Sequence, residues 1–155
     1  MRTAPTFIDA NIFLRHLVND DPVRSPACLA LFAGIEQGKR TGWTTDLVVA
    51  ELVFILAGKR HYHLSRPEVR AKLLPLLALP GLKIPHKRRY PRVFALYTTY
   101  PKLSYVDCYN AALVESNRTA PELYSYDAGF DRIVDDQGHQ TLTRVEPAPP
   151  DPTEE

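Results

Sequence analysis

The stretch Thr6-Phe7-Ile8-Asp9-Ala10-Asn11, residues 6–11, decides the fold of this 155-residue chain. A short apolar run ends at an aspartate, and a second apolar run begins at Ile12. The pattern predicts a strand over residues 6–8 and a helix over 12–18, with Asp9 at the carboxyl end of the strand. That end of a parallel strand is where ligands bind in open α/β sheets. Asp9 is therefore a candidate functional residue, although an aspartate there can also start a turn or cap the next helix.

The alternation of short strands and longer helices continues along the chain. Further strands are predicted over residues 42–44, 82–84, 123–126 and 141–145, and further helices over 26–37, 46–57, 66–77, 91–100 and 105–117. This order predicts an α/β fold with a parallel sheet and right-handed crossovers. We expect one domain over residues 1–146, followed by an acidic, proline-rich tail over 147–155 that is extended or disordered.

Composition excludes several classes of protein. Hydrophobic residues make up 45% and charged residues 24%, which is the balance of a globular domain. The two cysteines, Cys28 and Cys108, give no disulfide framework, so we expect reduced thiols in a cytoplasmic protein. Asp9 and Asn11 interrupt the first apolar stretch, which rules it out as a secretion signal. The apolar window 47–56 is too short to cross a membrane.

Positive charge is concentrated in the middle of the chain. Four of the 18 acids follow Arg144, which leaves 19 bases against 14 acids in residues 1–145. Between Glu68 and Asp107 there are eight bases and no acid. Such a field attracts a polyanion, although a charge run is more often a solvated face. The densest part is expected to be an exposed loop, and its candidate RNA-binding residues are Lys87, Arg88, Arg89, Tyr90 and Arg92.

Glu51 lies in the most apolar part of the chain. On a helix with about 100° per residue it is about 60° from Val48 and about 40° from Ile55, so we expect its carboxylate to point inward. A buried ionised carboxylate must be neutralised, paired with a base or bound to a cation. A buried pair with a base is the alternative, but the nearest bases belong to the helix end.

Two more aspartates, Asp107 and Asp127, are candidate functional residues. Asp107 closes Ser104-Tyr105-Val106-Asp107, which has the S-x-x-D form of a capping box. Capping alone is one interpretation, and a carboxylate turned inward with Glu51 is the other. Asp127 ends the apolar run that starts at Leu123, so it is expected at a second strand end.

Together, Asp9, Glu51, Asp107 and Asp127 form a candidate metal site. Four converging carboxylates repel one another unless a divalent cation lies between them. A ligand set of oxygen atoms favours Mg²⁺ or Mn²⁺ over zinc. Asp131, four residues after Asp127, is a candidate fifth metal ligand.

Four segments resemble the PIN-domain nucleases, and among them the single-domain VapC-type toxins of toxin–antitoxin pairs. The segments are residues 7–14 (FIDANIFL), 44–52 (TTDLVVAEL), 103–113 (LSYVDCYNAAL) and 123–131 (LYSYDAGFD). Their order, their spacing and the acid in each carry the resemblance. It implies a three-layer α/β/α sandwich on a five-stranded, mainly parallel sheet, with the four acids as catalytic residues that hold one or two Mg²⁺ or Mn²⁺ ions. It also implies that Asn11 and Ser125 support the site, that the toxin forms a homodimer, and that a cognate antitoxin inhibits it.

The resulting hypothesis is metal-dependent hydrolysis of RNA phosphodiester bonds. The basic stretch would hold flanking phosphates, and Tyr90 would stack on an unpaired base. One alternative is a PIN-like module that binds RNA or protein without cutting. A less favoured one is a metal-dependent small-molecule phosphohydrolase, because Asp9-Ala10-Asn11 lacks the second aspartate of a D-x-D motif. No phosphate-binding glycine loop is present, and the close pair His61 and His63 suggests no zinc site.

Overall fold

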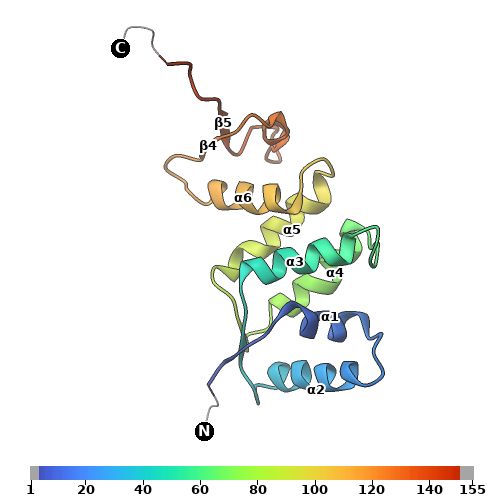
Figure 1. The fold of residues 1–155 in the computed structure, drawn as a ribbon. Coiled ribbons are helices and arrows are strands. Elements are labelled where there is room, and N and C mark those ends of the chain that lie inside the picture. Colours follow the sequence, from blue (N-terminus) through green and yellow to red (C-terminus); the bar gives the residue numbers. More distant parts are fainter. Residues whose placement is uncertain (1–3, 151–155) are drawn as a thin grey trace. The chain divides into compact units, whose positions relative to one another are not determined.

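The computed structural model describes residues 4–150 (Figure 1). The chain divides into two compact units, Met1–Phe94 and Ala95–Glu155, and the division falls within helix α5.

The first unit alternates strands and helices, as the sequence predicts. Its elements are β1 (Thr6–Phe7), α1 (Ala10–Val18), α2 (Arg24–Glu36), β2 (Gly42–Trp43), α3 (Asp46–Ala57), α4 (Arg66–Leu77), β3 (Leu82–Lys83), the 3-10 helix η1 (Lys87–Arg89) and the start of α5 (Tyr90–Thr99). The strands form a parallel sheet in the order β1-β2-β3, with Thr6 opposite Gly42 and Gly42 opposite Leu82.

Gly42 and Thr44 fix the end of β1. A Cβ at Gly42 would lie 2.4 Å from Cδ1 of Ile8, so only glycine lets the Ile8 side chain cross β2. The buried Thr44 hydroxyl donates to the Ile8 carbonyl at 2.9 Å, and the Ile8 amide donates to the Trp43 carbonyl at 2.9 Å. Because both polar groups of Ile8 are bonded to β2 and the residues that follow it, the backbone that leads into Asp9 is held in place.

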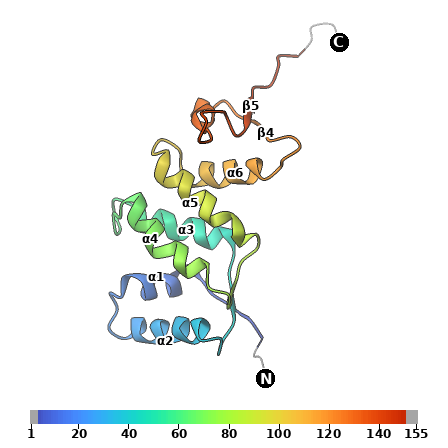
Figure 2. The same ribbon diagram turned by 180° about the vertical axis from the view of Figure 1, so that it is seen from behind.

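Helices α1 and α2 lie side by side in both views of the chain (Figures 1 and 2). Phe13 of α1 and Phe32 of α2 are buried, with ring centroids 5.1 Å apart. His16 lies one turn farther along α1 and stacks at 4.5 Å on the same Phe32 ring. The apolar spacing in both sequences therefore produces a packed helix pair.

The second unit contains the remaining elements. They are the rest of α5, α6 (Tyr105–Glu115), β4 (Glu122–Tyr124), the 3-10 helix η2 (Ala128–Arg132) and β5 (Thr143–Val145). Strands β4 and β5 pair in parallel, with Leu123 opposite Arg144. Phe130, Ile133 and Leu142 are buried, so the turn that follows β4 is anchored by its own apolar side chains.

The α/β class and the parallel pairing of strands are confirmed, with three corrections. The described strands form one sheet of three and one of two, rather than a single sheet of five. The basic segment is the 3-10 helix η1 and the first turn of α5, rather than a loop. Glu51 is exposed rather than buried. Residues 147–150 of the tail have no regular secondary structure, and residues 151–155 lie outside the described residues.

Across residues 4–150, no helix has both the length and the apolar character to span a membrane. Cys28 and Cys108 are both buried, and neither forms a disulfide within the described residues.

Candidate metal centre

Asp9 is the N-cap residue of α1, but its side chain makes no capping hydrogen bond. The residue is exposed, and its carboxylate forms no hydrogen bond or ion pair within the described residues. An N-cap aspartate normally accepts a bond from the second or third helical amide. Asp9 therefore occupies the N-cap position without capping through its side chain, and the carboxylate remains open to a ligand. Asn11, predicted to support the site, is exposed in the first turn of α1.

The predicted inward orientation of Glu51 is wrong. The buried face of α3 consists of Val48, Val49, Leu52, Val53 and Leu56. This face is centred about 130° around the helix from Glu51. Its neighbours on the opposite face are apolar but solvent-exposed, since Leu47 is 82% and Phe54 is 73% exposed. Because α3 is apolar on every side, periodicity could not identify its inner face.

Glu51 is nevertheless a usable ligand. Its carboxylate is exposed, and it forms no hydrogen bond or ion pair in the part of the chain that the structure describes. Burial therefore does not require a cation at Glu51, but the side chain is accessible to one.

Asp107 is both a cap and an open carboxylate. Its amide donates to the Ser104 hydroxyl oxygen at 3.0 Å, and its Oδ2 accepts from the Ser104 amide at 3.1 Å and from the Ser104 hydroxyl at 2.8 Å. The predicted capping box at the start of α6 is thus confirmed. All of these carboxylate bonds end on Oδ2, so Oδ1 of this half-buried residue has no hydrogen-bond donor among residues 4–150.

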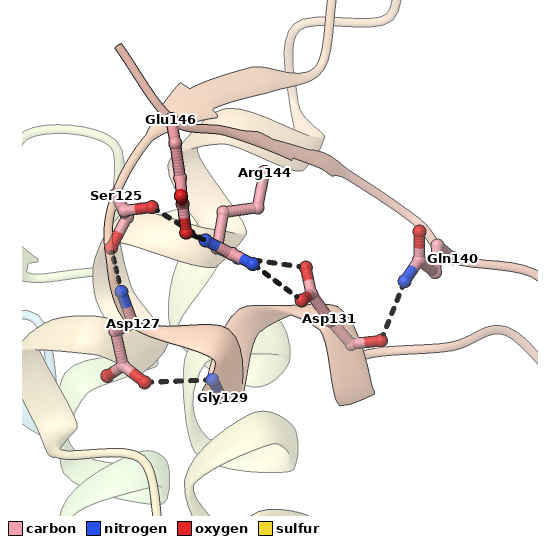
Figure 3. Close-up of polar contacts among 7 residues, drawn as sticks. All are labelled: Ser125, Asp127, Gly129, Asp131, Gln140, Arg144 and Glu146. Carbon is pink, nitrogen blue, oxygen red and sulfur yellow. Dashed lines mark hydrogen bonds and ion pairs between the residues drawn. The ribbon is translucent and has the colours of Figure 1, made fainter. Parts of the chain in front are cut away.

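Asp127 is held in a similar way just after β4. Its amide donates to the Ser125 hydroxyl oxygen at 3.0 Å, and its Oδ1 accepts from the Gly129 amide at 2.8 Å (Figure 3). A Cβ at Gly129 would lie 2.9 Å from Oδ1 and 3.0 Å from Cδ2 of Leu103. The glycine therefore permits the close approach of its backbone to the carboxylate. Oδ2 of Asp127 accepts no hydrogen bond within the described residues.

Asp131 differs from the other four acids because a base neutralises it. Arg144 Nε donates to Oδ1 at 3.1 Å, and Arg144 Nη2 donates to Oδ2 at 3.0 Å, so both carboxylate oxygens are bound (Figure 3). The hydrogen bonds to Asp131, and secondarily to Glu146, raise the pKa of Arg144. A carboxylate in a bidentate pair with arginine has no oxygen left without a donor, which argues against metal ligation by Asp131.

The four remaining acids divide equally between the units, with Asp9 and Glu51 in the first and Asp107 and Asp127 in the second. Among the described residues of either unit, no three His, Cys, Asp or Glu side chains gather in a group that could hold a metal. Each of the four has at least one carboxylate oxygen without a donor among residues 4–150. Hard oxygen donors of this kind fit Mg²⁺ or Mn²⁺.

The basic segment contains residues of two kinds. Lys87 Nζ donates to the carbonyls of Leu79 and Leu82 at 2.7 and 2.8 Å, and burial, with a smaller contribution from repulsion by Lys83, lowers its pKa. Tyr90 is 1% exposed, and its hydroxyl donates to Asp46. Stacking of Tyr90 on a base is therefore contradicted, since the ring belongs to the core.

Three arginines of the segment remain accessible. Arg88 and Arg92 are exposed, and Arg89 is half-buried. Arg88 lines a cavity of about 610 Å³ together with Trp43 and Lys83. Trp43 is 43% exposed and packs edge-on against Phe7, with centroids 4.8 Å apart. Sequence reasoning missed Trp43 because it was assigned only to a strand.

Comparison with known families agrees with the sequence interpretation. The model of the PIN domain family matches residues 6–135. No curated protein matches the chain.

Proposed function

The chain belongs to the PIN domain family, whose members are in general nucleases, and we propose that it is a Mg²⁺- or Mn²⁺-dependent endoribonuclease. Residues 1–146 act as the nuclease domain. Asp9, Glu51, Asp107 and Asp127 hold one or two ions, and Asn11 and Ser125 support them.

One observation carries the proposal. Every one of the four acids keeps a carboxylate oxygen without a donor among the described residues, and none of them forms an ion pair with an arginine or lysine there. The adjacent Asp131, by contrast, is fully paired. Because unpaired carboxylates gain most from binding a cation, each of these four is suited to coordinate one.

Several residues of the chain orient the proposed metal ligands. When bound, a divalent ion supplies an acidic water molecule as the nucleophile and stabilises the leaving oxygen. The Ser125 hydroxyl and the Gly129 amide orient Asp127, and the Ser104 hydroxyl orients Asp107. Thr44 fixes the backbone before Asp9.

RNA is bound through its phosphates by the accessible arginines. Arg88, Arg89 and Arg92 supply the positive charge, and Lys87 shapes the segment through its two carbonyl contacts. Trp43 beside Arg88 offers an exposed ring for stacking, the role that buried Tyr90 cannot take.

The decisive experiment measures metal binding and RNA cleavage on the same samples. We expect Mn²⁺ to bind in calorimetry and single-stranded RNA to be cut only when the metal is present. Asp127→Asn should lower both metal affinity and cleavage by more than about 100-fold, because it removes a direct ligand. Asp136→Asn, an exposed acid on the same unit, is the matched control and should behave as wild type. Metal binding without cleavage would favour a non-catalytic module.

RNA binding is tested by its salt dependence. Replacing Arg88 and Arg89 with alanine should weaken RNA binding and reduce the slope of log affinity against log salt by about 1.4, since each phosphate contact on single strands contributes about 0.7. An unchanged slope would remove these arginines from the RNA interface.

We also propose that the protein is the toxin of a type II toxin–antitoxin pair and forms a cytoplasmic homodimer. The resemblance of the four acidic segments to VapC-type toxins supports this. A small gene for a DNA-binding antitoxin beside this one, whose product abolishes RNA cleavage, is the expected finding. Light scattering that yields a monomer mass would contradict the dimer.

A further inference from the structure

Arg144 joins three segments of the second unit at one guanidinium. Its Nε and Nη2 bind both oxygens of Asp131 in η2, and its Nη1 donates to the Ser125 carbonyl at 3.0 Å and to Glu146 Oε1 at 2.7 Å (Figure 3). The arginine side chain is only 15% exposed. The contacts thus join β5 to both ends of the turn that contains Asp127.

A backbone hydrogen bond also ties the start of that turn to β5. The Ser125 amide donates to the Val145 carbonyl at 3.1 Å, where the β4-β5 ladder ends. From there to Asp131, the Ser125 hydroxyl and the Asp127 carboxylate bond to backbone amides of the turn, the Gln140 side chain donates to the Asp131 carbonyl at 2.9 Å, and buried Phe130 anchors the centre. The orientation of Asp127 therefore depends on where Ser125 and Asp131 are held.

We propose that Arg144 is a positioning residue that holds the Ser125–Asp131 turn in the conformation in which Asp127 presents Oδ2 to a metal ion. Asp131 is then the counter-ion of Arg144, and it acts on the site only through the guanidinium. This inference rests on the proposed function.

The bidentate geometry explains why arginine stands at this position. A planar guanidinium can bind two carboxylate oxygens and a carbonyl at once, whereas the lysine ammonium is a point charge. Glu146 follows Arg144 by two residues and is 55% exposed. It therefore neutralises the arginine from the β5 segment, without reaching the turn.

The test begins with Mn²⁺ titration of purified protein. Arg144→Gln should lower Mn²⁺ affinity by about tenfold, the usual effect of removing a group that orients a ligand. Arg144→Lys should recover part of the loss. Glu146→Gln is the matched control, and we expect its Mn²⁺ affinity to stay within about twofold of wild type. Wild-type affinity in Arg144→Gln would overturn the proposal.

A double-mutant cycle separates the two roles of Asp131. If Asp131 acts through Arg144, the losses in Asp131→Asn and Arg144→Gln should not add in the double variant. Additive losses would mean that Asp131 reaches the metal independently, and would overturn its role as a counter-ion.

Metal-free NMR distinguishes failure of this inference from failure of the proposed function. In Arg144→Gln, amide shifts of Ser125, Asp127 and Gly129 should move while that of the buried Ala111 in α6 stays, which also shows that the variant folds. If Asp127→Asn leaves Mn²⁺ affinity unchanged, the metal site itself is wrong. If Asp127→Asn abolishes binding and Arg144→Gln moves neither the shifts nor the affinity, only the positioning role is wrong.

Discussion

Helices α1 and α6 both begin beside a proposed metal ligand, yet the two starts are held in different ways. At α6, Ser104 and Asp107 form a reciprocal capping box. At α1, Asp9 occupies the N-cap position without making a capping bond, and the helix depends on Phe13 and His16 packing against Phe32. The start of α6 is secured by hydrogen bonds of Asp107 itself, and α1 is secured by apolar contacts of other residues.

The difference predicts how each acid would reach the proposed metal ion. Asp107 is oriented before any ion arrives, because one oxygen is already bonded. Asp9 has no such bond, so a bound ion would have to fix its carboxylate, at a cost in side-chain entropy. The proposed ligands in the second unit are therefore already oriented, and those in the first are accessible.

The largest effect should come from removing the acids themselves. Asp9→Ala and Asp107→Ala should each lower metal-dependent cleavage by more than about 100-fold, since each removes a direct ligand.

The stabilities of these two variants should differ. In about 0.5 M salt, which screens helix dipoles, Asp107→Ala should lose about 1 kcal/mol of unfolding free energy, and Asp9→Ala much less. Equal losses in urea unfolding would contradict the comparison.

A smaller effect is expected at the turn that holds Asp127. Gly129→Ala places a Cβ against Oδ1 of Asp127 and Cδ2 of Leu103, so the carboxylate must shift. Metal affinity should fall about tenfold, with about 1 kcal/mol of overpacking cost. Gly34→Ala is the control, because its new Cβ meets only the flexible Arg40 side chain. Wild-type Mn²⁺ affinity in Gly129→Ala would show that Asp127 needs no preformed orientation.

Helix α4 begins with the same kind of capping box as α6. Comparing the two separates the effect of the cap on stability from its effect on the proposed metal site. Ser65 and Glu68 form the same capping box at α4, and neither of them is a proposed ligand. Ser65→Ala and Ser104→Ala should each cost about 1 kcal/mol of unfolding free energy. Only Ser104→Ala should also weaken Mn²⁺ binding, by about threefold, because it frees Asp107. A weaker metal site in both variants would point to a general loss of stability.

The smallest effect concerns the packing that secures α1. Burial lowers the pKa of His16 below its usual 6.5, with Glu36 partly opposing the shift, and its buried Nδ1 has no hydrogen bond among the described residues. The unfolded chain therefore binds this proton more readily. The contribution of His16 to stability is complete above about pH 6.5 and is lost as pH falls toward its folded pKa. His16→Leu should flatten the decline in urea stability between about pH 7.5 and pH 5.5, and an identical decline in both proteins would refute it.

Local patterns in the sequence predicted most of the fold. The predicted strands and helices agree with those observed to within a few residues, because each is defined by periodicity and by a cap such as Ser104. Periodicity could not predict the orientation of Glu51, since a helix that is apolar all round does not indicate its buried side. Tyr90 was misassigned for a similar reason, because its partner Asp46 lies 44 residues earlier.

The sequence by itself determined which acids stand at the ends of strands and the starts of helices, since those positions follow from short-range backbone geometry. Only the tertiary structure decided which of these acids remain open. Asp127 and Asp131 look equivalent along the chain, but Arg144, which is 13 residues from Asp131, reaches one carboxylate and leaves the other accessible. Charge pairing over such separations depends on how the strands and turns pack, so it emerges only once the chain has folded.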